Sequence, residues 1–362
     1  QPGVPPVNQM VELIRQKLSS KPELALAFAA ALAEGAPEER YRRAFTFLLG
    51  CEGQDAVNAL VRRAVLQARQ SGARAPDRAV LTGADEACRL LMEDDIDGWA
   101  LSPGVEALGR LAACPRVLDT ILTTNFDPLI EVAIARAQGR AHRTVLHSDG
   151  SLAGRTGQGT HVIYLHGYWY GSDTLHTDLQ IGTARDKLGS SLRSLLRDRL
   201  FLVVGYGGWD DVFMNALAEV LADDQAQPDV LWAFHESDPA VIERKYQVIM
   251  PHIGRRRFAA YCGVDLHTLL PEMARRFIPM TAEVTASAAE ERRDSARSPS
   301  RDRSARSAGS AGAEFVTNAS DDEAFARAMF GPFSYEKRYC DSTSKGHYFP
   351  REIDRRLDDG LQ

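Results

Sequence analysis

The sequence predicts a doubly wound α/β protein with a mostly parallel sheet and an inserted layer of helices. Three observations lead to this fold class. Between residues 116 and 278, short apolar runs typical of buried strands alternate with segments of helical periodicity. Residues 8–115 carry helical patterns and hardly any strand signal. Three of the apolar runs end in polar or glycine residues, at the edge where open α/β sheets bind ligands.

The inserted layer is predicted to consist of several helices. Met10, Ile14 and Leu18 recur at helical spacing. An acidic run at 93–97 lacks the ligand alternation and central glycine of a calcium loop, so we expect a solvated loop there. We expect the layer to form one wall of the ligand crevice and to carry contacts between copies in a homo-oligomer. Further helical patterns cover 22–34, 38–50, 54–70, 84–93 and 103–113.

Strands and helices are predicted to alternate along residues 116–278. Such alternation favours a parallel sheet with right-handed crossovers. The expected strands are 117–124, 144–146, 161–165, 200–204, 230–234 and 258–261. The expected helices are 128–138, 185–199, 211–222, 239–249 and 266–277.

Three strand ends carry the candidate ligand residues. The first strand ends in the sequence TTNFD at residues 123–127. A second strand ends at His166-Gly167, and a later strand is followed by Gly205-Tyr206-Gly207. The simpler interpretation of the first run is that Asn125 and Asp127 only cap the following helix. The repetition of such ends on three strands favours one shared crevice.

These segments, TTNFD, YLHG and VVGYGG, in this order, resemble the sirtuin-type NAD-binding fold. The variant is most similar to the NAD hydrolases that act as effectors of bacterial anti-phage defence, over about residues 1 to 275. The resemblance implies a Rossmann-like sheet with NAD as the substrate. The residues implied to bind NAD are Thr124, Phe126, Gly167, Gly205, Tyr206, Gly207, Gly3 and Pro5.

Three side chains are the catalytic candidates. The amide of Asn125 is suited to holding the attacking water or a ribose hydroxyl. An imidazole titrates near neutral pH, so His166 is the candidate general base, the alternative being a structural core histidine. The resemblance implies that Asp127 holds the ribose or the nicotinamide carboxamide. Asp210 or Asp211 is expected to cap the next helix, and His176 has no functional context in the sequence.

Two departures from the family pattern reduce the number of possible functions. Protein deacylases of this family carry paired zinc-binding cysteines after the H-G dipeptide, whereas residues 167–204 contain no cysteine. We therefore expect no zinc or other metal, and NAD hydrolysis rather than protein deacylation. The family's serine or threonine in the glycine turn is replaced by Gly207-Gly208.

The two ends of the sequence suggest truncation. Gly3-Val4-Pro5 resembles a G-I-P segment that follows the family's first strand and phosphate-facing loop, so we expect that strand to be missing; a processed protein beginning at Gln1 is the alternative. The predicted domains are 1–280, a disordered linker at 281–314 and a truncated region at 315–362 that resembles the approach to a sensor NTPase. An RNA-binding arginine-serine tail is disfavoured because acids interrupt it.

Composition excludes several functional classes. The formal net charge of −6 provides no field for nucleic-acid binding, and no run approaches the length of about 18 apolar residues that a membrane span needs. Five scattered cysteines indicate reduced thiols in a cytoplasm. Together with these exclusions, the resemblance implies a cytoplasmic NAD glycohydrolase gated by a sensor domain or a phage protein. A non-catalytic module that binds NAD or ADP-ribose is the alternative, and a protein deacylase is less favoured.

Overall fold

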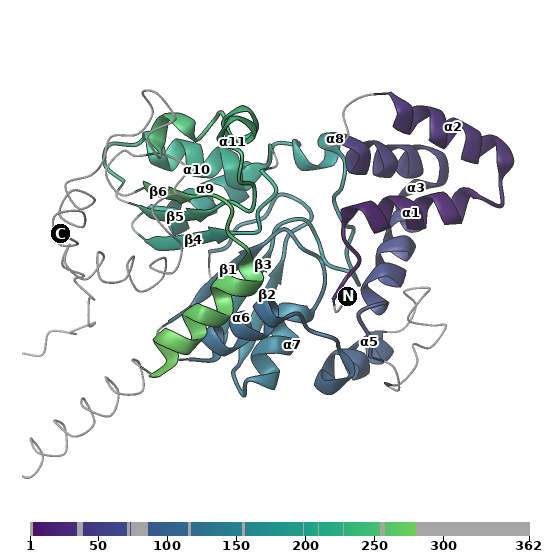
Figure 1. Ribbon diagram of the computed structural model, residues 1–362. Helices are drawn as coiled ribbons and strands as arrows, with labels where there is room; N and C mark the ends of the chain where they lie inside the picture. Colours follow the sequence, from purple (N-terminus) through teal and green to yellow (C-terminus); the bar gives the residue numbers. More distant parts are fainter. Residues whose placement is uncertain are drawn as a thin grey trace, which may run out of the picture.

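The computed structural model describes residues 3–34, 39–70, 73, 86–114, 117–153, 156–197, 199–208, 210–226, 228–253 and 258–279. The predicted linker at 281–314 and the predicted region at 315–362 lie outside these residues. The fold class is confirmed, because helices and parallel strands combine in one α/β structure with two three-stranded sheets (Figure 1).

The helices before the first strand form a layer beside the sheets. In α1 the buried side chains of Met10, Ile14 and Leu18 recur every four residues and face α3. The predicted break near residue 50 is a kink inside α3 at Gly53, whose φ of 80° suits glycine. The layer contains α1 (Val7–Leu18), α2 (Pro22–Ala33), α3 (Arg40–Leu66), α5 (Glu86–Asp94) and the 3₁₀ helix η2 (Ile96–Gly98).

Helix α6 (Pro103–Ala113) was predicted as part of this layer, but it covers the sheets. It begins after Ser102, whose hydroxyl accepts a hydrogen bond from the Val105 amide, with proline in the first turn. Gly109 allows a close approach to α7 (Leu129–Arg136), because a Cβ there would lie 2.4 Å from the carbonyl carbon of Ala133.

The first sheet consists of β1 (Thr120–Thr123), β2 (Ala141–Val145) and β3 (Thr160–Tyr164) in the order β1-β3-β2, all parallel. Successive side chains along β3 and the residue after it point to opposite faces of the sheet, so they pack in two different hydrophobic clusters. Val162 and Tyr164 pack with α7 and the helical layer, whereas Ile163 and Leu165 pack with the helices of the second half. The sheet is therefore buried on both faces, as expected for a doubly wound fold.

The second sheet has the order β4-β5-β6 and is also parallel. Val230 and Trp232 of β5 face α9 and α10, while Leu231 faces helix 266–279 on the opposite side. Its strands are β4 (Leu200–Val204), β5 (Asp229–Ala233) and β6 (Phe258–Tyr261). The helices associated with this sheet are α9 (Asp186–Leu196), α10 (Val212–Ala222), α11 (Pro239–Lys245) and the 3₁₀ helix η3 (Met250–His252). The short helix α8 (Asp178–Ile181) contacts α3 instead, through Asp178 and Arg42.

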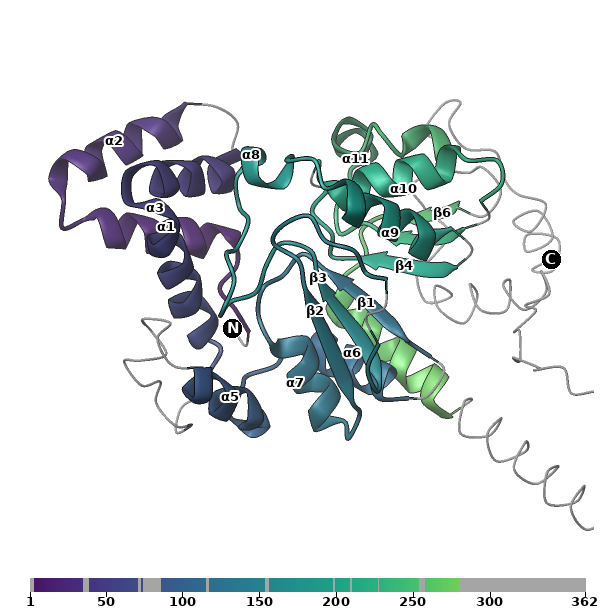
Figure 2. The same cartoon turned by 180° about the vertical axis from the view of Figure 1, so that it is seen from behind.

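The two sheets meet at β1 and β4. Asp119 and Arg199, which immediately precede these strands, form an ion pair at 2.9 Å, and Leu118 and Leu202 share one hydrophobic cluster. Seen from behind, α8 lies between the helical layer and the second half of the molecule (Figure 2). Within the described ranges, no helix has the length and apolar character needed to cross a bilayer.

Candidate functional site

The three strand ends identified in the sequence come together in the structure. The backbone amide of Trp169 donates to the carbonyl of Phe126 at 2.7 Å, which joins the segment after β3 to the turn after β1. The side chain of His166 contacts Asp211 at 3.0 Å, which joins the same segment to the turn after β4. The ends of β1, β3 and β4 therefore form one site.

The turn after β1 presents one exposed and one buried polar side chain. Asn125 is exposed, and its backbone amide donates to Thr123 Oγ1 at 3.1 Å. Asp127 is only 7% exposed, and its Oδ1 accepts a hydrogen bond from the Leu129 amide at 3.1 Å. Burial raises the pKa of Asp127 from its ordinary value of 3.8 to about 6. Asp127 thus does cap the start of α7, and its carboxyl group is held in an apolar environment.

His166 belongs to a buried pair with Asp211. His166 is 4% exposed and Asp211 is fully buried. Asp211 Oδ1 accepts hydrogen bonds from the Tyr206 hydroxyl at 2.8 Å and from the Met214 amide at 3.0 Å, while Oδ2 faces His166 Nε2. The expected helix cap is present, but no pattern in the sequence indicates that the same carboxylate also contacts the candidate base.

The glycines at the strand ends have distinct roles. Gly167 has a φ of 87°, and a Cβ there would lie 1.9 Å from the Asp173 carbonyl oxygen, so this glycine is needed to close the loop. Gly205 also has a positive φ, of 62°, and is exposed together with Gly207. Tyr206 between them is held by the hydroxyl of Tyr246, which donates to its carbonyl at 3.0 Å.

His176 connects the site to the helical layer, a role that the sequence did not indicate. Its Nδ1 lies 2.7 Å from the Tyr41 hydroxyl, and its ring stacks on Phe45 of α3 with centroids 4.0 Å apart. On its other side the ring contacts Phe126, at 5.3 Å between centroids. Burial, together with the nearby His166, lowers the pKa of His176 to about 3, so this imidazole is neutral.

The aromatic residues after Gly167 pack inside the protein. Tyr168 and Trp169 are almost fully buried, and both donate to Glu93, at 2.7 Å and 3.0 Å. Arg143 also contacts Glu93 at 2.8 Å and lies 4.2 Å from the centroid of the Tyr168 ring. The prediction of a solvated loop at 93–97 is therefore wrong for Glu93, whose carboxylate is an acceptor in a largely buried network.

Arg185 is a buried cation beside His166. Its Nη1 donates to the carbonyl of Leu165 at 2.7 Å, and the residue is 5% exposed. Its Nε and Nη2 atoms have no hydrogen-bond partner. Burial lowers the pKa of Arg185, while the negative charges of Asp211 and Asp149 act in the opposite direction. Among the described residues, these two buried atoms meet no acceptor.

Gly3 and Pro5 lie in the segment that leads into α1. Val4 between them packs against the cluster that also contains Phe126. Their contact with a ligand stays a prediction, as do the binding roles assigned to Thr124 and Phe126.

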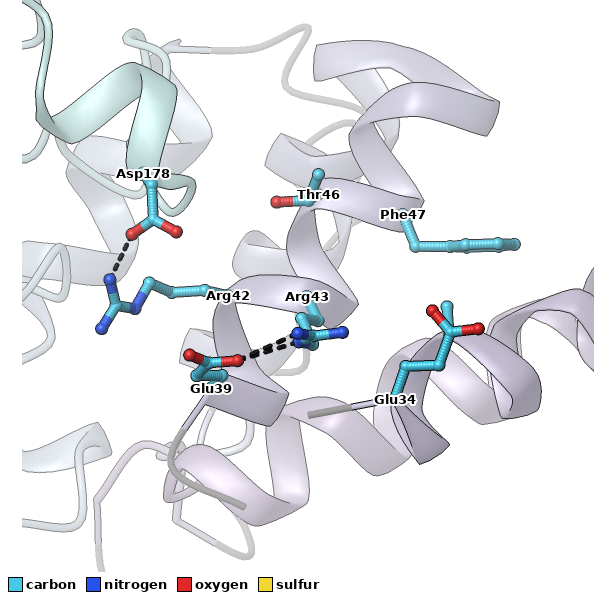
Figure 3. Close-up of a pocket in the computed structure, with 8 residues that line it drawn as sticks. Glu34, Glu39, Arg42, Arg43, Thr46, Phe47 and Asp178 are labelled. Atoms are coloured by element: carbon cyan, nitrogen blue, oxygen red, sulfur yellow. Dashed lines mark hydrogen bonds and ion pairs between the residues drawn. The ribbon is translucent and has the colours of Figure 1, made fainter. Parts of the chain in front are cut away.

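No metal centre is formed by the described residues, since they contain no group of three His, Cys, Asp or Glu side chains placed to hold an ion. A cavity of about 500 Å³ lies instead between α2, α3 and α8 (Figure 3). Glu39 pairs with Arg43, and Arg42 pairs with Asp178 at its rim. Its lining contains none of the strand-end residues, so this cavity is separate from the site.

The comparison with known families finds a match over the part of the chain that carries these strands. No curated protein matches the chain in sequence. Residues 119–261 match the model of the SIR2-like domain family, a range that includes Asn125, His166 and the turn at 205–207. In the part of the chain that carries all three strand ends, the protein is thus similar to the SIR2-like domain.

Proposed function

We propose that this protein is an NAD glycohydrolase that cleaves NAD to nicotinamide and ADP-ribose. The observation that carries the proposal is the buried His166–Asp211 pair, which lies within the SIR2-like range and at the same strand ends as Asn125. A histidine held by a carboxylate at the carboxyl edge of a parallel sheet is a suitable general base. As in the sequence resemblance, the biological role would be depletion of NAD during phage infection.

The described residues fit an NAD molecule. Two phosphates and two riboses present many acceptor oxygens, and the exposed Asn125 offers an amide that can donate to them. The exposed Gly205 and Gly207 leave the backbone open to close approach by a phosphate or ribose.

The chemistry required of these residues is modest. Nicotinamide is a good leaving group, because it departs neutral with the bonding electron pair while positive charge develops on the ribose. Asn125 would orient the attacking water, and His166 would take the water proton as the new C–O bond forms. Asp127, when ionised, would place a negative charge beside the developing cation.

Release of nicotinamide from NAD tests the proposal. We expect release by the protein, with loss of at least about 100-fold in Asn125→Ala and His166→Ala. His147→Ala is the matched control, since this histidine is exposed. Because the effector is expected to be gated, the assay is run with and without co-expressed phage proteins, and the oligomeric state is measured by light scattering.

Two outcomes would contradict the proposal. Binding of NAD without release under every condition would replace the hydrolase with a signalling module that binds NAD or ADP-ribose. Transfer of an acyl group from a lysine peptide to ADP-ribose would instead show a protein deacylase.

A further inference from the structure

We propose that Asp211 is the positioning residue for His166 and that it makes Nδ1, rather than Nε2, the nitrogen that accepts the proton. This inference rests on the proposed hydrolysis for its catalytic meaning. It is carried by the hydrogen bonds of a single fully buried carboxylate.

Both carboxylate oxygens of Asp211 contact hydrogen-bonding groups that the fold holds in place. Oδ1 accepts from the Tyr206 hydroxyl at 2.8 Å and the Met214 amide at 3.0 Å. These bonds come from the turn after β4 and from the first turn of α10, so they anchor the carboxylate to two elements. Oδ2 is left facing His166 Nε2 at 3.0 Å.

A carboxylate can only accept hydrogen bonds, so its contact with Nε2 requires a proton on that nitrogen. A neutral imidazole carries one proton, and the second nitrogen then holds the lone pair. In this arrangement the lone pair of His166 is on Nδ1. When Nδ1 takes a proton from water, the positive charge of the imidazolium is offset by Asp211 behind it.

The carboxylate of Asp211 lies next to two sources of positive charge. The carboxylate caps the amino terminus of α10, where the partial positive charge of the helix stabilises an anion. The guanidinium of Arg185 adds a second favourable charge from the start of α9. His176, the nearby neutral imidazole, brings no competing positive charge.

Asp211→Asn tests the proposal with little change in shape. The amide oxygen can still accept from Tyr206 and Met214, but the amide nitrogen then faces Nε2 and donates to it. The proton of His166 must move to Nδ1, so the lone pair is lost from the catalytic position. We expect kcat to fall by about 10³-fold with little change in KM, as is typical when a base is held in the wrong tautomer.

Two further variants distinguish a role of Asp211 in positioning His166 from a role in folding. Asp210→Asn changes the exposed neighbouring carboxylate and should leave kcat within about 2-fold of wild type. Tyr206→Phe removes one of the bonds that anchor Asp211, and we expect about a 10-fold loss. Wild-type kcat in Asp211→Asn would overturn the proposal.

The tautomer itself provides a readout that does not depend on activity. In the full chain labelled with ¹⁵N-histidine, the His166 signals, identified by their loss in His166→Gln, should show a proton on Nε2 in wild type and on Nδ1 in Asp211→Asn. A proton on Nδ1 in wild type overturns the proposal. If wild type fails to cleave NAD but carries the Nε2 proton, the proposed hydrolysis fails while the placement of His166 by Asp211 stands.

Discussion

Replacing Asp127 with asparagine should stabilise the protein while impairing its activity. The carboxyl group of Asp127 is buried, and burial raises its pKa from 3.8 to about 6. Asparagine has the same shape, and its Oδ1 can still accept the hydrogen bond from the Leu129 amide. The substitution therefore removes the cost of a buried charge and keeps the cap of α7.

The sign and size of this change in stability follow from the shift in the pKa of Asp127. Since the folded-state pKa lies above the unfolded value, the folded protein binds the proton more tightly between pH 3.8 and about 6, and stability falls as pH rises through this window. Above the window the full cost is present. It amounts to about 3 kcal/mol near pH 7.5 and about 1.5 kcal/mol near pH 5.

Urea unfolding at these two pH values, followed by circular dichroism, measures the effect. We expect Asp127→Asn to unfold at higher urea than wild type, with the larger gain at the higher pH. Asp210→Asn, which changes an exposed carboxylate, should show a gain near zero at both. Equal or lower stability of Asp127→Asn near pH 7.5 would refute the argument that this carboxylate is buried at a cost.

Three other predictions test separate parts of the structure. Glu93→Ala removes the acceptor of the buried Tyr168 hydroxyl and Trp169 ring N–H and should cost about 3 kcal/mol in urea unfolding. Asp94→Ala, at an exposed carboxylate, should cost less than about 0.5 kcal/mol. Gly205→Ala should cost about 1 kcal/mol for its positive φ, and Gly167→Ala considerably more, because its Cβ would also clash with a carbonyl oxygen; equal losses would contradict this ranking. Because His176 stays neutral in the folded state, its contribution to stability falls as pH falls from 6.5 towards 3, opposite in sign to the contribution of Asp127. The stability at pH 5 relative to pH 7 should therefore be about 2 kcal/mol higher in His176→Gln than in wild type, and an unchanged slope would contradict the burial of His176.

Local patterns in the sequence predicted most of the strands. The runs at 161–165, 200–204 and 230–234 lie within a residue of β3, β4 and β5, because a buried strand between glycines and helices is defined by its own few residues. The strand expected at 144–146 is observed as β2, which already begins at Ala141. Its first residues escaped the prediction because His142 and Arg143 are polar and half-buried, so they do not extend the apolar run. The division into two sheets was not predicted, because it depends on which strands pair.

The candidate site was predictable only as far as its positions on the strands. His166 and Asn125 stand out because they follow apolar runs. The partner of His166 lies 45 residues away, and the donors to Glu93 lie 75 and 76 residues away. Asp211 looked like a helix cap, and Glu93 looked like part of a surface charge run. Only the folded chain shows that each has a second partner.

The contact between the two sheets couples the two halves of the molecule. Among the described residues, the two sheets share no ladder hydrogen bond, and side-chain contacts such as Asp119–Arg199 and His166–Asp211 cross between them. Apolar side chains cross as well, because Ile163 and Leu165 belong to the core of the second half. A core shared in this way favours unfolding of both halves in one cooperative transition. Two separate transitions in calorimetry would show that the shared core does not bind the halves into one cooperative unit.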